Sequence, residues 1–164
     1  PSLVDSKASG ARMGNKVGKV CSACVARDEQ AEPPAPPKSP TALSVSIFKA
    51  SGLKNKNMTG DNIYCLCEMA SKDGRPPQMF RTTTKKDLNP EWNEVYDLKW
   101  QAETDTYVDG LLFTIYSSGM LADKTEGTVD VKKEAFLTEG GFEGELPIVG
   151  CDDGKLGIKI DLVY

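Results

Sequence analysis

Apolar and polar residues alternate with a period of two along most of the chain after residue 41. Strict alternation is typical of a β-strand that places one face in a core and the other in water. The clearest stretch is the last, where Gly157, Lys159 and Asp161 separate apolar residues. The pattern predicts strands in the following runs: Leu43–Ile47, Ile63–Met69, Tyr96–Trp100, Leu111–Ile115 and Leu156–Tyr164.

Short clusters of turn-forming residues separate these runs. They lie at 71–77, 88–90, 117–119 and 151–154 and are rich in Gly, Pro, Asn, Asp and Ser. Only Val131–Leu137 has a pattern that could form a helical turn. About eight short strands at this spacing are typical of a sandwich, so we predict an all-β fold, an eight-stranded antiparallel β-sandwich.

The first 41 residues lack any hydrophobic period, and their last part, 32–40, is dominated by proline. Such a run favours an extended polyproline-II spacer and cannot continue a helix or a central strand. We therefore place a domain boundary at Pro40–Thr41. It separates an irregular N-terminal arm with a Pro-rich linker (residues 1–41) from the sandwich domain (residues 42–164).

The composition limits the classes of function that the chain can have. The 164 residues carry a net charge of −4 and include no histidine. Histidine-based triads, Cys-His pairs and His-bearing metal sites are therefore excluded. Carboxylates, Cys, Lys and Tyr could still act in catalysis, but no constellation of them stands out in the sequence, so we expect no catalytic residues and no enzyme. Residues 42–164 hold 14 basic and 20 acidic side chains, an acidic balance that argues against a nucleic-acid partner. No apolar run reaches the roughly 20 residues of a transmembrane helix.

The five cysteines form no obvious disulfide pattern. Cys21 and Cys24 form a C-x-x-C pair without the second pair that a structural zinc site needs, so we interpret them as incidental. Cys65 and Cys67 lie two apart on one predicted strand, where a disulfide is sterically poor. A reducing compartment or an organelle is therefore favoured over secretion.

One interpretation of the arm depends on where translation starts. Residue 1 is Pro and not Met, so we expect a processed, trimmed or incomplete chain. If translation began at Met13, Gly14 would become an N-terminal glycine suited to myristoylation, with Cys21 and Cys24 as palmitoylation candidates. The alternative is a plain flexible linker, which the composition favours because Gly18 stands where the motif requires Ser or Thr.

Several segments, in order along the chain, resemble one known family. Leu88-Asn-Pro-Glu-Trp-Asn-Glu94 follows a basic stretch, and Gly60-Asp-Asn-Ile-Tyr64 precedes a predicted strand. Together with residues 43–53 and 111–116 they resemble the C2-type domains of protein kinase C, phospholipases and synaptotagmins. The run at 156–164 as final strand suggests the permuted, type II strand order. We expect the Asn89–Trp92 motif to shape a turn and to have no activity of its own.

The resemblance implies a calcium site made of carboxylates in two loops at one end of the sandwich. Carried across, the ligand positions fall mostly on residues without a carboxylate; they are Asn57, Asn62, Ser117 and Asp123 (or Lys124), with Asp61 adjacent. Calcium prefers six to eight oxygen ligands, several of them charged. We therefore expect no cofactor, with weak calcium binding as the upper limit.

The resemblance also implies a second binding surface, a basic strand that attracts anionic lipid or a partner. Its candidates here are Lys72, Arg75, Arg81, Lys85 and Lys86. Cations near an anionic leaflet each contribute up to about 1 kcal/mol, but they work here against an acidic domain. Met120 and Leu121, at the tip of a later loop, are a further candidate for contact with a bilayer.

These considerations predict a non-enzymatic, calcium-independent C2-like docking module whose partner is a protein. Its arm would extend along the partner, and the chain would serve as an accessory or scaffolding subunit. The assembly would be membrane-bound and organellar, for example photosynthetic or respiratory. The alternative is a peripheral signalling module that binds phospholipid on an anionic membrane through the basic strand or the acylated arm.

Overall fold

The computed structural model describes residues 39–55, 62–71, 76–100, 105 and 108–164. Its strands are β1 (Ala42–Ser51), β2 (Asn62–Ser71), β3 (Met79–Arg81), β4 (Glu91–Lys99), β5 (Val108–Ser118), β6 (Lys124–Lys132), β7 (Phe142–Pro147) and β8 (Lys155–Val163). One short helix, α1 (Lys133–Phe136), lies inside the stretch where a helical turn was predicted. The predicted boundary at Pro40–Thr41 lies at the start of the described residues and stays a prediction.

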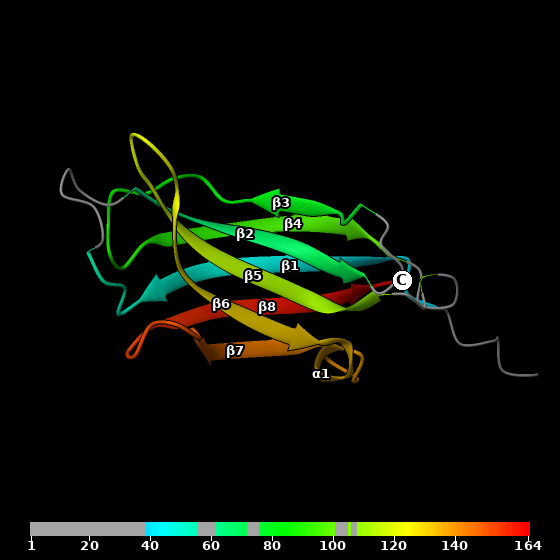
Figure 1. Ribbon diagram of the computed structural model, residues 1–164. Coiled ribbons are helices and arrows are strands. Elements are labelled where there is room, and N and C mark those ends of the chain that lie inside the picture. The colour runs from blue at the N-terminus through cyan, green and yellow to red at the C-terminus, as the bar shows by residue number, and fades with distance from the viewer. Residues whose placement is uncertain (1–38, 56–61, 72–75, 101–104, 106–107) are drawn as a thin grey trace, which may run out of the picture. The chain divides into compact units, whose positions relative to one another are not determined.

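The strands form two antiparallel sheets of four. Sheet A has the order β4-β1-β8-β7, and sheet B has the order β3-β2-β5-β6. Figure 1 shows the sheets as two layers, with β2 and β5 in front of β1 and β8. The predicted eight-stranded β-sandwich is therefore confirmed.

The final strand lies inside its sheet. β8 pairs with β1 from Ala42↔Val163 to Ser51↔Lys155 and with β7 on its other side. This position between the first strand and β7 confirms the permuted order expected from the sequence. A register shift between Ile47 and Lys49 makes a bulge at Phe48, which turns Phe48 and Lys49 away from the core.

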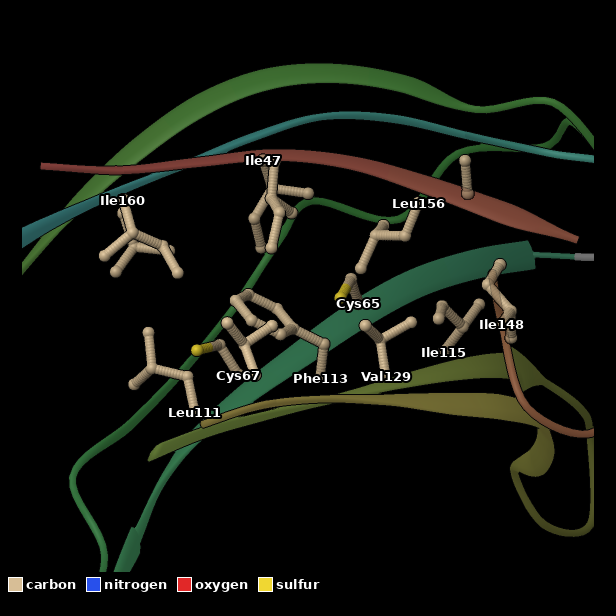
Figure 2. Packing of buried hydrophobic residues seen from close by; sticks show 14 of the residues in the cluster. Ile47, Cys65, Cys67, Leu111, Phe113, Ile115, Val129, Ile148, Leu156 and Ile160 are labelled. Carbon is tan, nitrogen blue, oxygen red and sulfur yellow. The ribbon is translucent and has the colours of Figure 1, made fainter. Parts of the chain in front are cut away.

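The core forms where the alternating apolar residues of the two sheets meet. Figure 2 shows Ile47, Leu156 and Ile160 of sheet A pointing toward Cys65 and Phe113 of sheet B. All five side chains are fully buried. Burying a side chain of this size contributes about 1.5–3 kcal/mol, so this shared face is the main source of stability. The described cysteines, Cys65, Cys67 and Cys151, are free thiols.

Two details differ from the sequence-based expectation. Ser117 and Ser118 were expected in a turn, but they end β5 because Ser117 pairs with Ile63 on one side and Lys124 on the other. Ladder pairing on both sides outweighs the turn preference of serine. Tyr164 does not continue the buried face of β8 and is 64% exposed, because the strand ends at Val163. Within the described residues no helix is long and apolar enough to cross a membrane.

Candidate functional site

Four connections meet at one end of the sandwich, and their described parts are residues 52–55, 82–90, 119–123 and 148–154. We call this end the loop end; it lies at the left of Figure 1. Hydrogen bonds tie the connections to one another. The Gly52 amide donates to Asn89 Oδ1 at 3.0 Å, and Cys151 Sγ lies 3.1 Å from the Gly52 carbonyl oxygen. The β1–β2, β3–β4 and β7–β8 connections therefore support one another directly.

Gly52 is required at this junction. Its φ is +70°, and an added Cβ would lie 2.2 Å from the Asp153 carbonyl oxygen. Only glycine adopts this backbone conformation readily and leaves room for such a close approach. Beside it, Lys54 Nζ forms an ion pair with Asp152 at 2.6 Å. The Asn89–Trp92 motif has the structural role expected, because Asn89 receives the Gly52 amide and Trp92 is buried.

The β5–β6 connection is held by the side chain of Tyr64. The Tyr64 hydroxyl donates to Asp123 Oδ2 at 2.7 Å. This hydrogen bond, together with those from the Ser118 side chain and the Gly119 amide, lowers the pKa of the Asp123 carboxyl. Burial and the hydrogen bond to Asp123 raise the pKa of Tyr64 to about 12. The Asp123 carboxylate is thus stabilised as an anion by groups of the protein itself.

A row of side chains crosses the outer face of sheet B next to this hydrogen bond. The Arg81 guanidinium lies over the Tyr64 ring, 4.7 Å from its centroid. Tyr64 in turn stacks on Tyr116 with the ring centroids 5.3 Å apart. The row therefore runs from β3 across β2 to β5, and its cation lies close enough to Asp123 to help lower the pKa of that carboxyl.

The tip of the β5–β6 connection carries two adjacent apolar side chains in full contact with solvent. Met120 is 92% exposed and Leu121 is 102% exposed. Single exposed apolar residues are common on protein surfaces, but two neighbours at a loop tip form a compact apolar contact point. They sit on a connection that the Tyr64–Asp123 hydrogen bond anchors to sheet B.

The predicted metal positions are only partly brought together. Asn62 begins β2, and its side-chain Nδ2 donates to the Ser118 carbonyl oxygen at 3.5 Å. Ser117 is fully buried inside the sandwich, whereas Asp123 lies on the exposed connection. Asn57 and Asp61 lie outside the described residues. Within the described part of the chain, no cluster of three or more cysteine or carboxylate side chains is arranged to hold a metal ion.

The predicted basic strand is also incomplete in the described residues. Arg81 ends β3, and Lys85 and Lys86 follow it on the β3–β4 connection, where all three are exposed. The Lys85 backbone pairs with Ile63, and its amide donates to the Ile63 carbonyl at 2.8 Å. Lys72 and Arg75 of this group, and the acylation candidates Gly14, Cys21 and Cys24, lie outside the described residues.

Sequence reasoning did not single out Tyr64 and Tyr116 as site residues. They pair directly across β2 and β5. A signal was present, because Tyr64 falls on the outward-facing register of a predicted strand and Tyr116 follows another in the same register, where an aromatic residue needs a partner to be covered. The pairing of strands more than 50 residues apart cannot be predicted from one sequence. The partner of each tyrosine could therefore not be identified from this signal.

Comparisons with known proteins were made on the sequence and on the fold. The sequence model of a family described as "C2 domain" matches residues 41–148. No curated protein sequence matches the chain significantly. A structure of CC2D1B, titled for the mitotic reformation of the nuclear envelope, matches with a TM-score of 0.64 and 21% identity. It covers 74% of this chain, which spans 55% of that one.

Two extended synaptotagmins have the same fold. A single C2 domain of plant Extended Synaptotagmin 1 matches with a TM-score of 0.61 and 22% identity, over 77% of this chain and 96% of that domain. The tandem C2 domains of Extended-Synaptotagmin 2 match with a TM-score of 0.62 and 17% identity. That match covers 88% of this chain and 48% of the other.

Proposed function

The chain belongs to the C2 domain family, and on this premise we propose that it is a non-enzymatic docking module that binds its partner without calcium. Its role would be that of an accessory or scaffolding subunit in a larger assembly. The observation that carries the proposal is the loop end, where hydrogen bonds within the protein hold a pair of exposed apolar side chains, Met120 and Leu121. The membrane-bound, organellar nature of the assembly stays a prediction.

The oxygen atoms that the loop end offers as metal ligands support binding of a partner without calcium. A calcium ion needs six to eight oxygen ligands, several of them charged. The described candidates do not fit this need, because Ser117 is buried in the sandwich and Asn62 has no charge. Asp123 brings a carboxylate, but Tyr64, Ser118 and Gly119 already donate to it. Binding calcium would exchange these hydrogen bonds for a ligand set with little charge.

The same hydrogen bonds suggest how the contact point works. In a calcium-dependent module the ion would order the loops before they meet their target. Here Tyr64 and Arg81 lie where they stabilise the Asp123 carboxylate, and the apolar tip is held in position beforehand. Such preorganisation favours binding because less conformational entropy is lost in the complex.

The proposal is tested by photo-cross-linking from the tip. A photoreactive analogue replaces Met120 in the full chain, which is produced in its native cells and irradiated with calcium present or chelated. We expect cross-links to protein under both conditions. The control places the same analogue at Val95, which is 62% exposed on β4 far from the tip in sequence. Equal cross-linking from both positions, or cross-links that need calcium, would contradict the proposal.

A second candidate function is binding to an anionic membrane. It is favoured by the exposed cations Arg81, Lys85 and Lys86, which follow one another along β3 and its connection. It is tested by sedimentation with phosphatidylserine vesicles at physiological salt, with and without calcium. The variant pair Met120→Gln/Leu121→Gln removes the apolar tip without adding charge, and Val95→Thr is the matched control. Calcium-independent pelleting that the pair variant abolishes would favour the membrane over a protein.

A further inference from the structure

The edge of sheet A at β7 has no partner strand among the described residues. β7 pairs with β8 along Phe142–Pro147, and within the described part of the chain no backbone hydrogen bond joins it to another strand. A strand edge of this length offers a row of amide and carbonyl groups to an added strand. The side chains around this edge determine which kind of strand can pair with it.

The surroundings of the edge are acidic. Residues 134–147, which follow Lys133 of α1 and run through β7, contain four glutamates and no lysine or arginine. All four are exposed; they are Glu134, Glu139, Glu143 and Glu145. Cations of the neighbouring strands approach two of these acids: Lys49 on β1 forms an ion pair with Glu145 at 3.0 Å, Lys159 on β8 lies opposite Glu143, and Lys155 interacts with Glu145. The charged side chains of β7 itself are all acidic. A chain that pairs with β7 would therefore meet a negatively charged strip.

The same glutamates disfavour pairing between two copies of the chain. In an antiparallel pair, residues directly opposite share a face, so Glu143 and Glu145 of one copy would face Glu143 or Glu145 of the other. We consider pairing of β7 with β7 of a second copy, with Phe142 and Leu146 of both copies on the same face. Every such register that overlaps the middle of β7 places a glutamate of one copy opposite a glutamate of the other. Like charges directly opposite one another destabilise a strand pair. The edge is thus open to a strand, but to one of opposite charge.

The two faces of the edge differ in what they accept. Phe142 and Leu146 turn toward the core and are partly buried, and between them an added Cβ at Gly144 would touch only the Phe142 ring, at 3.6 Å. Apolar side chains of an added strand would meet this inner face. On the outer face, Glu143, Glu145 and Lys49 border a hollow of about 160 Å³ that Gly157, without a side chain, leaves open beside Phe48. Lys49 pairs with Glu145, so Glu143 is the acid of this hollow that has no ion pair within the described part of the chain.

This hollow suits a long basic side chain. Lys and Arg cover apolar surface with their aliphatic stems and keep their charged ends in contact with carboxylates. A side chain that crosses β7 between Glu143 and Glu145 would place its stem at the rim of the hollow and its charge beside both acids. Basic residues at alternate positions of the added strand would all lie on this outer face.

We propose that β7 is a docking edge for an extended segment of another protein, with Lys or Arg at alternate positions and apolar residues between them. The segment adds a fifth strand to sheet A. Its apolar residues pack beside Phe142 and Leu146, and its basic residues pair with Glu143 and Glu145. The surface is separate from the loop end and does not depend on the function proposed for Met120 and Leu121.

The test uses a blocked peptide, Val-Arg-Val-Arg-Val-Arg-Val, titrated into the full chain by isothermal calorimetry, with hydrogen exchange to locate binding. We expect binding that slows amide exchange in residues 142–147. Charge reversal at Glu143→Lys/Glu145→Lys should weaken it about tenfold, the size expected for two reversed cross-strand charge pairs. The matched control Glu91→Lys/Asp97→Lys, on the other edge strand of sheet A, should leave the affinity unchanged, as should Met120→Gln/Leu121→Gln.

A second peptide separates strand addition from simple charge attraction. It has the same sequence with every backbone amide methylated, so it keeps its charge but cannot pair with a strand. We expect no binding from it. Equal binding of both peptides, equal loss in the two charge-reversal variants, or no binding would overturn the proposal. Protection, in the protein alone, of those β7 amides that point away from β8 would also overturn it. Protection that rises with protein concentration would then identify a second copy as the occupant, and constant protection a segment of the same chain.

Discussion

The two edge strands of sheet A, β4 and β7, are protected in different ways. At β4 the side-chain amide of Gln78 forms hydrogen bonds with both backbone groups of Lys99, donating to its carbonyl at 2.7 Å and accepting from its amide at 3.2 Å. At this one residue, the last of β4, the side chain takes the place of a neighbouring strand. At β7 no such cap is found among the described residues, and the protection consists of exposed glutamates.

The capped edge is also connected to sheet B. Glu94 accepts hydrogen bonds from Thr83 and from the Tyr96 hydroxyl, and Tyr96 stacks on Phe80 of β3 with the ring centroids 4.0 Å apart. Side-chain hydrogen bonds to an edge strand contribute to the stability of the fold. Charged side chains leave the backbone of the edge accessible and determine only which strands can pair with it. Substitutions at β4 should therefore change stability, and substitutions at β7 should change association.

The largest effect is expected from Trp92 on the capped edge. Trp92 is 6% exposed, and its Nε1 donates to the Thr83 carbonyl at 2.8 Å. Trp92→Ala should lower the free energy of unfolding by about 3–5 kcal/mol, because it leaves a cavity and an unsatisfied carbonyl. Urea denaturation measures the change. The control Trp92→Phe keeps most of the apolar area and should cost less; an equal loss in both variants would mean that the hydrogen bond, and not packing, dominates.

A smaller effect is expected from Glu94. Partial burial acts to raise the pKa of this carboxyl, but the hydrogen bonds from Thr83 and Tyr96 outweigh it and lower the pKa overall. A carboxyl whose pKa is lower in the folded state stabilises the fold above the unfolded pKa, and this contribution is lost as the pH falls through the folded pKa. Glu94→Gln should lower stability by about 1 kcal/mol at neutral pH.

The pH dependence provides the sharper measurement for Glu94. Melting temperatures of the wild type and Glu94→Gln should differ at about pH 7 and converge as the pH falls through the lowered pKa of the wild-type carboxyl. The control is Glu91→Gln, on the same strand but exposed. A difference between wild type and Glu94→Gln that stays constant with pH would contradict the assigned role of the charge.

The smallest effect on stability is expected at β7. Glu143→Ala/Glu145→Ala removes an exposed ion pair with Lys49, and such pairs contribute little to stability, so the free energy of unfolding should change little. The same change removes the charge that opposes pairing between copies, and self-association should increase. Sedimentation velocity over a range of protein concentrations measures this. A double variant with a clearly lower free energy of unfolding that stays monomeric would contradict the assignment of β4 to stability and β7 to association.

Much of the sandwich could be predicted from the sequence because burial alternates with the same period as the strand backbone. Leu43, Val45 and Ile47 alternate along the sequence, and all three are fully buried. The prediction was wrong at Ser117, since a serine between turn-forming residues gives no sign that two strands will pair with it. Strand pairing is a long-range property, and local preference gives way to it.

The loop end was harder to predict than the strands. The ligand positions expected from the resemblance stay predictions, and the interactions of Asp123 depend on Tyr64, which lies on another strand. The Gln78 cap on Lys99 likewise joins segments that no local pattern relates. Met120 and Leu121 could be noted as apolar, yet their full exposure follows from the short connection between β5 and β6.

The central position of β8 has a consequence for how the domain is made. β1 is the first strand of the sandwich to leave the ribosome, and its neighbour at Ala42↔Val163 is the last. Sheet B can pair earlier, because β2, β3, β5 and β6 are all synthesised before β8. During translation one hydrogen-bonding edge of β1 therefore lacks its partner strand, and contacts between such distant strands form slowly. A nascent chain halted before Lys155 would expose the apolar side chains of β1 and β7, which makes this stage the one at which a chaperone is most needed.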